Sequence, residues 1–322
     1  MKKPQVESSA PASATAPDRG RTIGYGVLAA IVGFVAMWLY AHGRSAVSTN
    51  SRPALVPTVA SARFADNVWH LPGDPLLGFV AIPAGPFLMG SDPAHDPSAY
   101  ENERWSQAMK QGTVDLPEFY IGRYEVTIAQ FAAFVAATHR PVDSQTLRGA
   151  DDHPVANVTW SDAIAYAQWL ESELLGSAQA PAALRALLDQ GWHFTLPSEA
   201  QWEKAARGTD GRIYPWGNVA DATKANFGRS GVAAVGGAEC AECAHGLADM
   251  AGNVWELTRS PFQPYPWDAT DQPRASGTDA LFVMRGGGFN DGPANARTAI
   301  RGGIDPGARR PFIGFRLVLE RR

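Results

Sequence analysis

The chain has 322 residues and a formal net charge of −4, from 28 Lys and Arg against 32 Asp and Glu. This length is enough for one large core or two small domains. The charge is too mild for nucleic-acid binding, and no basic stripe interleaved with aromatic residues runs through the sequence. The 32 Gly and 10 Trp suit a fold with many turns and large buried aromatics.

The N-terminal region predicts a membrane anchor. Residues 1–21 are rich in Ser, Ala, Pro and charge, so we expect a disordered tail. Residues 22–41, TIGYGVLAAIVGFVAMWLYA, carry no charge. As a helix this segment would be about 30 Å long, which matches the core of a bilayer. Tyr25, Trp38 and Tyr40 lie near its ends, as interfacial aromatics do.

The flanking charges predict the orientation of this anchor. Basic residues precede the apolar segment closely and follow it more sparsely: Lys2, Lys3, Arg19 and Arg21 before it, Arg44, Arg52 and Arg63 after it. The positive-inside rule then places the N-terminus in the cytoplasm and the rest in the periplasm, on a single-pass inner-membrane protein. A cleaved signal peptide is the alternative, but its apolar region is usually about 7–15 residues, shorter than this one. A buried core helix is a further alternative.

Residues 42–75 are rich in Ser, Pro and Ala and are typical of a tether. The folded domain is therefore expected over residues 76–322. An extracytoplasmic compartment is oxidising, so a disulfide between the chain's two cysteines, Cys240 and Cys243, is chemically permitted.

Within this domain the patterns predict three helices and a few short strands. Helices are expected over 127–138, 161–176 and 198–208; Thr127 with Gln130 and Ser198 with Gln201 have the spacing of capping boxes. Strands are expected over 79–90, 119–127, 282–289 and 314–320. Because helices and strands do not alternate regularly, the pattern argues against a doubly wound sheet.

Common catalytic signatures are absent from the sequence: there is no G-x-S-x-G elbow, P-loop, dinucleotide fingerprint or HExxH. A lone histidine such as His193 is more often a packed or surface residue than a ligand.

Eight segments in order nevertheless resemble one family. They are FVAIPAGPFLMGSD, YEVTIAQFAAFV, HPVANVTWSDAIAYAQWL, FTLPSEAQWEKAARG, YPWGN, GLADMAGNVWELT, VMRGGGFND and IGFRLV. Together they resemble the sulfatase-modifying-factor family, whose founding members are the formylglycine-generating enzymes. The resemblance covers roughly residues 76–320. It implies an α+β, C-type-lectin-like fold with little regular secondary structure.

The resemblance also implies a copper site that this chain lacks. In the formylglycine-generating enzymes two cysteines bind Cu(I), which favours soft thiolates, and a cysteine of the substrate is oxidised. The matching positions here are Asp291 and Ala296, and residues 281–322 contain no cysteine. Formylglycine-generating activity is therefore not expected.

Three interpretations of Cys240 and Cys243 remain open: a small structural disulfide, a redox-active or metal-binding pair with Glu239, Glu242 or His245, and free thiols. Copper or iron at this pair stays an open question. The His does not directly follow the second Cys, which argues against haem attachment.

A structural calcium ion is implied at Asp249, Gly252, Val254 and Glu256, which match the family's ligand positions. Carboxylate and carbonyl oxygens are the ligands Ca²⁺ prefers. The alternative is a tight turn in which Asp249 and Asn253 bind backbone N–H groups. The family's other calcium site uses a longer loop, so only Asn226 is a weak candidate for it.

A possible substrate cleft is implied at Arg285, Asp291, Arg297, Arg301 and Arg316. The alternative is that these arginines tie loops together through carboxylates and carbonyls. The tryptophans of the matched segments are expected in the core rather than on a ligand platform: Trp160, Trp202, Trp216 and Trp255.

Two functions remain in view. The first is a non-catalytic accessory, maturation or assembly factor for another exported or membrane protein, such as a metalloprotein. The second is a divergent metal-dependent oxidase acting on a cysteine or other thiol. A third, weaker alternative is recognition of a glycan or peptide without chemistry.

Overall fold

The computed structural model describes residues 73–238, 240–266 and 280–322. The predicted tail, membrane helix and most of the tether (1–72) lie outside the described residues. Among the helices that are described, none has the length and apolar character needed to cross a membrane.

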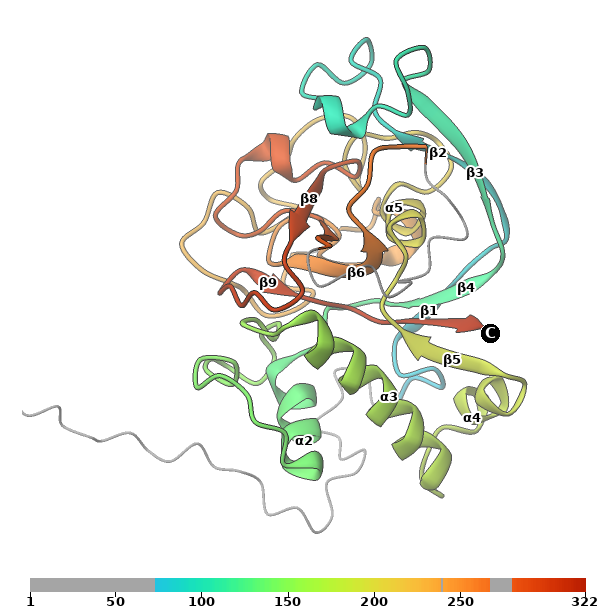
Figure 1. The fold of residues 1–322 in the computed structure, drawn as a ribbon, viewed down its shortest axis with the longest axis vertical. Helices are drawn as coiled ribbons and strands as arrows, with labels where there is room; N and C mark the ends of the chain where they lie inside the picture. Colours follow the sequence, from blue (N-terminus) through green and yellow to red (C-terminus); the bar gives the residue numbers. More distant parts are fainter. Residues whose placement is uncertain (1–72, 239, 267–279) are drawn as a thin grey trace, which may run out of the picture. The chain divides into compact units, whose positions relative to one another are not determined.

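The described residues form an α+β domain of short elements joined by long loops (Figure 1). Its α-helices are α2 (Ile128–Thr138), α3 (Trp160–Gly176), α4 (Ala182–Asp189) and α5 (Glu199–Arg207). Its strands are β1 (Phe79–Ile82), β2 (Gly85–Gly90), β3 (Gln111–Leu116), β4 (Phe119–Gly122), β5 (Trp192–Thr195), β6 (Trp255–Pro261), β7 (Phe282–Arg285), β8 (Arg301–Ile304), β9 (Ile313–Gly314) and β10 (Val318–Arg321). Single 3₁₀ turns lie at Glu101–Glu103, Ala244–Gly246 and Pro293–Asn295.

The strands form three small sheets. The first has the order β1-β4-β10-β5, the second pairs β2 with β3, and the third has the order β8-β7-β6-β9. Neighbouring strands are antiparallel except β6 and β9, which run parallel. The mixture of helices with mostly antiparallel sheets is the α+β class that the family resemblance implies.

The first sheet separates two hydrophobic clusters. On one side, α2, α3 and α4 pack together (Figure 1), with Phe131, Tyr166 and Leu170 buried against Phe194 and Leu319 of the sheet. On the other side, a second cluster joins the opposite face of the sheet to α5, β2 and β3; its members include Ile82, Phe119, Ile121, Val318, Trp202, Phe87 and Val114. Each face of the sheet is therefore covered, which fixes the register of its strands.

Helix α5 differs from an ordinary amphipathic helix because it is buried on every side. All nine of its residues are buried, including Glu199, Glu203, Lys204 and Arg207. It lies between β2, β6 and β8 in Figure 1. The charged residues that the sequence pattern assigns to a solvent face therefore need partners inside the domain.

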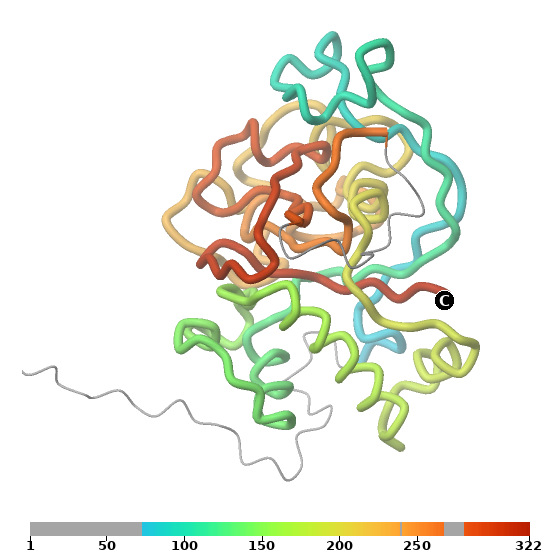
Figure 2. Tube along the Cα trace, viewed as in Figure 1, coloured from blue at the N-terminus to red at the C-terminus, as the bar shows by residue number. Residues whose placement is uncertain are grey.

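Most of the chain between α5 and β6 runs as loops, which Figure 2 shows in yellow and orange. Glycines and asparagines with positive φ make the sharp changes of direction in this region, among them Gly217, Gly236 and Asn253.

The predicted elements are partly confirmed. The capping boxes at Thr127 and Ser198 are present. The helix expected from Ser161 begins at Trp160, because Thr159 is the residue whose hydroxyl accepts from the Asp162 N–H. The strand expected over 79–90 is two strands that belong to different sheets. Five elements carry too weak a pattern for prediction from sequence: β3, α4, β5, β6 and β8.

The cap of α3 is testable. We expect Thr159→Ala to lower the free energy of unfolding by about 1 kcal/mol, because the Asp162 N–H loses its acceptor. Ser172→Ala, exposed on the same helix, is the matched control and is expected to change it by less than about 0.5 kcal/mol. Urea denaturation followed by circular dichroism measures both; equal effects would show that the Thr159 hydroxyl does not stabilise the helix end.

Candidate functional site

Asp291, at the first of the two positions matched to copper-binding cysteines, holds its own loop together. Its Oδ2 accepts from the Trp255 indole N–H at 2.7 Å and from the Gly288 N–H at 2.9 Å. Its Oδ1 accepts from the Asn295 amide at 2.7 Å. Both oxygens are thus engaged by donors, and the carboxylate links the Gly-rich loop after β7 to strand β6.

Ala296, at the second position, is completely buried. It packs in a third hydrophobic cluster with Tyr214, Ala225, Phe227 and Ala251. A methyl side chain supplies no metal ligand. The second position at which the resemblance implies a soft ligand is therefore part of the packing of the loops.

The four predicted cleft arginines are all inside the domain, at most 4% exposed. Arg285 pairs with Glu199 at 3.2 Å and with Glu203, and Arg301 pairs with Glu199 at 2.7 Å. These are the carboxylates of α5, so β7 and β8 are tied to the central helix.

The other two arginines form separate pairs. Arg297 donates to Asp96 at 2.7 Å and to both oxygens of Glu103, at 2.7 and 2.6 Å. Arg316 donates to both oxygens of Glu256, each at 2.6 Å. All four guanidinium groups therefore tie loops together through buried carboxylates, which is the alternative to a substrate cleft given above. None of them presents its charge to solvent.

The turn before β6 brings Asp249, Gly252 and Asn253 together in left-handed backbone conformations, with φ of 56°, 77° and 57°. A Cβ at Gly252 would meet the backbone of Asn226, so glycine is needed there. Asn253 is completely buried and its amide donates to Glu125 at 2.7 Å. The Asp249 carboxylate accepts from the Gly236 N–H.

These residues fit calcium only in part. The Glu256 carboxylate is taken by Arg316 and also accepts from the Trp202 indole at 2.7 Å. Among the described residues no group of three or more His, Cys, Asp or Glu side chains is arranged to hold a metal ion. Asp249 and the backbone carbonyls of Gly252 and Val254 remain as hard oxygen donors. A site made mainly of carbonyls needs few such side chains.

Glu125 is a buried carboxylate that the sequence analysis did not single out. It accepts from Asn253 and from the Val254 N–H, and it lies in the same charge cluster as Asp249, Glu256 and Arg316. Three carboxylates therefore share one guanidinium. Burial raises the pKa of Glu125 well above its usual range, and the charges of Asp249 and Glu256 add to this. Burial also raises the pKa of Asp249.

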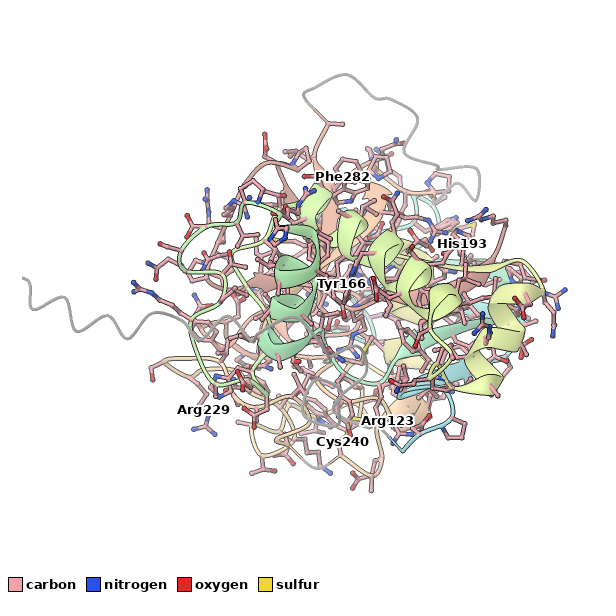
Figure 3. All side chains as sticks on the ribbon, turned by 90° about the horizontal axis from the view of Figure 1, so that it is seen from below. Arg123, Tyr166, His193, Arg229, Cys240 and Phe282 are labelled. Carbon is pink, nitrogen blue, oxygen red and sulfur yellow. A yellow bond between two sulfur atoms is a disulfide. The ribbon has the colours of Figure 1, made fainter. Side chains whose placement is uncertain are left out.

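Cys240 and Cys243 are joined in a disulfide. Both are partly exposed, and the two residues between them are exposed. Figure 3 places Cys240 at the edge of the domain opposite Phe282. The pair is on a different loop from Asp291 and Ala296. Glu239 lies outside the described residues.

The remaining candidates are packed residues. Trp202 and Trp255 are buried as expected, whereas Trp160 and Trp216 are only partly buried. His193 contacts the Glu320 carbonyl through Nδ1 at 3.1 Å. It lines a groove of about 380 Å³ between α3 and β5, together with Glu171 and Arg322 (Figure 3). None of the residues singled out for copper or calcium lines this groove.

Comparison with known proteins points to a single family. The model of the family described as "Sulfatase-modifying factor enzyme 1-like domain" matches residues 70–321. Hercynine oxygenase of Mycolicibacterium smegmatis is 29% identical over 287 residues, covering 75% of this chain and 61% of that protein. The formylglycine-generating enzyme of Thermomonospora curvata is 28% identical over 314 residues, covering 76% and 93%. The inactive Cα-formylglycine-generating enzyme 2 of Bos taurus is 32% identical over 184 residues, covering 51% and 50%.

The chain thus spans about six tenths of the length of the hercynine oxygenase it matches. Among solved structures, PvdO from Pseudomonas aeruginosa has a TM-score of 0.61 at 23% identity, covering 75% of this chain and 94% of that one. This likeness shows a shared fold. The relatives therefore include both oxidising enzymes and a protein described as inactive.

The three carboxylates around the single guanidinium of Arg316 predict that the free energy of unfolding falls as the pH rises. A raised pKa means that the folded state holds its proton more tightly than the unfolded chain. The stability contributed by protonated Glu125 is present below the usual value of 4.5 and is lost as pH rises through the higher folded value. Each unit of pKa difference is about 1.4 kcal/mol.

We expect Glu125→Gln to flatten this pH dependence, measured by urea unfolding from pH 4 upward. The exposed Glu118→Gln is the matched control and is expected to leave it unchanged. A variant with the same slope as the parent protein would show that Glu125 is ionised throughout the pH range.

Proposed function

The chain belongs to the sulfatase-modifying factor enzyme 1-like family, and we propose its function on that basis. Its role is that of a non-catalytic accessory factor in the maturation or assembly of another exported or membrane protein, such as a metalloprotein. The proposal places the domain on the periplasmic side of the inner membrane, anchored by the helix expected over residues 22–41.

The observation that carries the proposal is the pair of residues at the positions matched to the copper cysteines. Asp291 engages both carboxylate oxygens within its loop, and Ala296 is a buried methyl group. Neither offers the soft sulfur ligands that Cu(I) prefers. A relative described as inactive is consistent with a family member that keeps the fold and lacks the oxidase chemistry.

The anchor is supported by the sequence of residues 22–41 and its flanking basic residues. Single-pass anchoring keeps a domain close to clients that are themselves in or crossing the membrane. Protease accessibility in spheroplasts tests the orientation. Digestion of the domain from the periplasmic side is expected, and protection of the domain would contradict it.

A peptide containing C-x-P-x-R tests for oxidase activity. With copper or iron, oxygen and a reductant, we expect no aldehyde from the full-length protein, because residues 291 and 296 offer no thiolates. Asp291→Cys/Ala296→Cys is the matched variant and is expected to gain stoichiometric Cu(I) binding. Metal-dependent aldehyde formation by the unmodified protein would instead support the divergent-oxidase alternative.

The accessory role itself is tested in native membranes. Deleting the gene is expected to leave one exported or membrane protein immature or unassembled. Restoring the full-length protein, or the Asp291→Ala variant of equal abundance, is expected to rescue it, because the role does not use residue 291 chemically. Failure of the unmodified protein to affect the state of any exported or membrane protein would contradict the role.

We also propose a structural calcium ion at the turn 249–254, held by Asp249 and the carbonyls of Gly252 and Val254. The excess of buried carboxylate charge around Arg316 supports a cation here. Calcium is expected to raise the melting temperature of the protein, because a ligand of the folded state stabilises it. Asp249→Asn is expected to lose that increase, whereas Asp189→Asn, an exposed control, is expected to keep it. No calcium-dependent shift in the parent protein would contradict the site.

A further inference from the structure

The disulfide between Cys240 and Cys243 does not belong to the family's metal chemistry described above. The bond closes a very small loop, since the two cysteines are three positions apart. We propose that this pair is a thiol–disulfide exchange site, which accepts two electrons from a cysteine pair of another protein.

A structural role explains this bond poorly. The entropy that a disulfide removes from the unfolded chain grows with the length of the loop it closes. A bond across three positions therefore stabilises the fold little compared with one that joins distant segments. It also lies within one loop, so it does not link different elements of the domain.

Exposure makes the sulfur atoms reachable by a partner. Cys240 and Cys243 are partly exposed, while Ala241 and Glu242 between them are exposed. The turn is at the surface of the domain, as Figure 3 shows for Cys240. Accessible disulfides are the ones that exchange with other thiols.

Contacts other than the disulfide hold the turn in place. The Arg212 guanidinium donates to the carbonyls of Glu242 and Pro215, each at 2.7 Å. The Cys243 N–H donates to the Cys240 carbonyl at 3.2 Å, and the Ala244 N–H donates to the Pro215 carbonyl at 3.2 Å. The turn can therefore keep its shape when the bond is reduced, and the two thiols stay adjacent.

Two cations contact Glu242, one of the two residues between the cysteines. Arg212 binds the Glu242 carbonyl, and Lys224 pairs with the Glu242 carboxylate at 2.7 Å. Arg212 also pairs with Asp210, and His245 lies in the turn that follows Cys243. Each of these cations is paired with a carboxylate, so they anchor the turn that carries the two sulfur atoms, whose thiolate is both the attacking and the leaving form in exchange.

The proposed step is balanced within the two proteins. A thiolate of the partner attacks one of the two Sγ atoms, the Sγ–Sγ bond breaks, and the other Sγ leaves as a thiolate that takes up a proton. The partner's second thiol loses its proton and attacks the mixed disulfide. The partner's pair is then a disulfide and Cys240 and Cys243 are thiols; a second disulfide, such as oxidised glutathione, reverses the change.

This inference does not rest on the proposed accessory role, because small thiols can test it without the partner. The full-length protein is equilibrated with mixtures of reduced and oxidised glutathione, and the thiols are then alkylated. Trypsin releases residues 230–259 as one peptide that holds both cysteines, so mass spectrometry reads the redox state of the pair directly.

We expect the pair to be reduced reversibly at millimolar glutathione, with the circular dichroism spectrum unchanged. Cys243→Ser and Cys240→Ser are each expected to form a stable mixed disulfide with oxidised glutathione, releasing one reduced glutathione, because the second cysteine that would displace it is gone. Arg212→Gln is expected to slow exchange by about threefold or more, since the turn loses the guanidinium that binds the Glu242 and Pro215 carbonyls and keeps the two sulfur atoms adjacent. Arg310→Gln, an exposed arginine that donates to the Arg309 carbonyl, is the matched control.

Two results would overturn the proposal. One is a disulfide that stays oxidised throughout millimolar reduced glutathione while the protein remains folded. The other is reduction that unfolds the domain, which would make the bond a structural staple. If Arg212→Gln perturbs the fold, Lys224→Gln, which removes a partly exposed ammonium, replaces it in the same measurement.

Discussion

The ion pairs between helix α5 and strands β7 and β8 are the interaction on which the rest of the domain depends. Glu199 and Glu203 are buried with Arg285 and Arg301, and the same Arg285 guanidinium donates to the carbonyls of Thr298 and Ala299. An unpaired charge in this position would cost several kcal/mol, about 3–5 for a broken buried pair. The helix, the third sheet and the loop between β7 and β8 must therefore assemble together.

Buried arginines also join other loops of the domain, where regular backbone pairing is missing. Arg297 joins the loop before β8 to Asp96 and Glu103 near the start of the domain. Arg316 joins the C-terminal segment to Glu256 of β6 and to the carbonyls of Gly122 and Ala248. Because a guanidinium offers five donors in a fixed plane, one arginine can bind several loops at once. These arginines connect loops to one another, and their charges are paired with carboxylates inside the domain.

The contacts that hold the loops together are separate from the cysteine pair. In the loop after β7, Asp291 holds the backbone with hydrogen bonds and Ala296 contributes a buried methyl group. The two cysteine sulfur atoms lie instead on a surface turn before the Asp249 turn. The cysteine pair and the Asp291 loop are therefore separate parts of one scaffold.

The sequence by itself determined the local features: the apolar faces of α2 and α3 and the capping boxes at Thr127 and Ser198, which follow from the spacing of neighbouring residues. It also shows that residues 291 and 296 are not cysteines, and the resemblance of its segments to one family implied the α+β class. The tertiary structure decided which carboxylate meets which arginine, because Glu199 and Arg301 are 102 positions apart. It also decided that β5 and β10 pair, that α5 is buried on every side, and that Glu125 joins Asp249 and Glu256 around Arg316. No local pattern encodes these contacts, since they form only when the chain packs and buried charges must find partners.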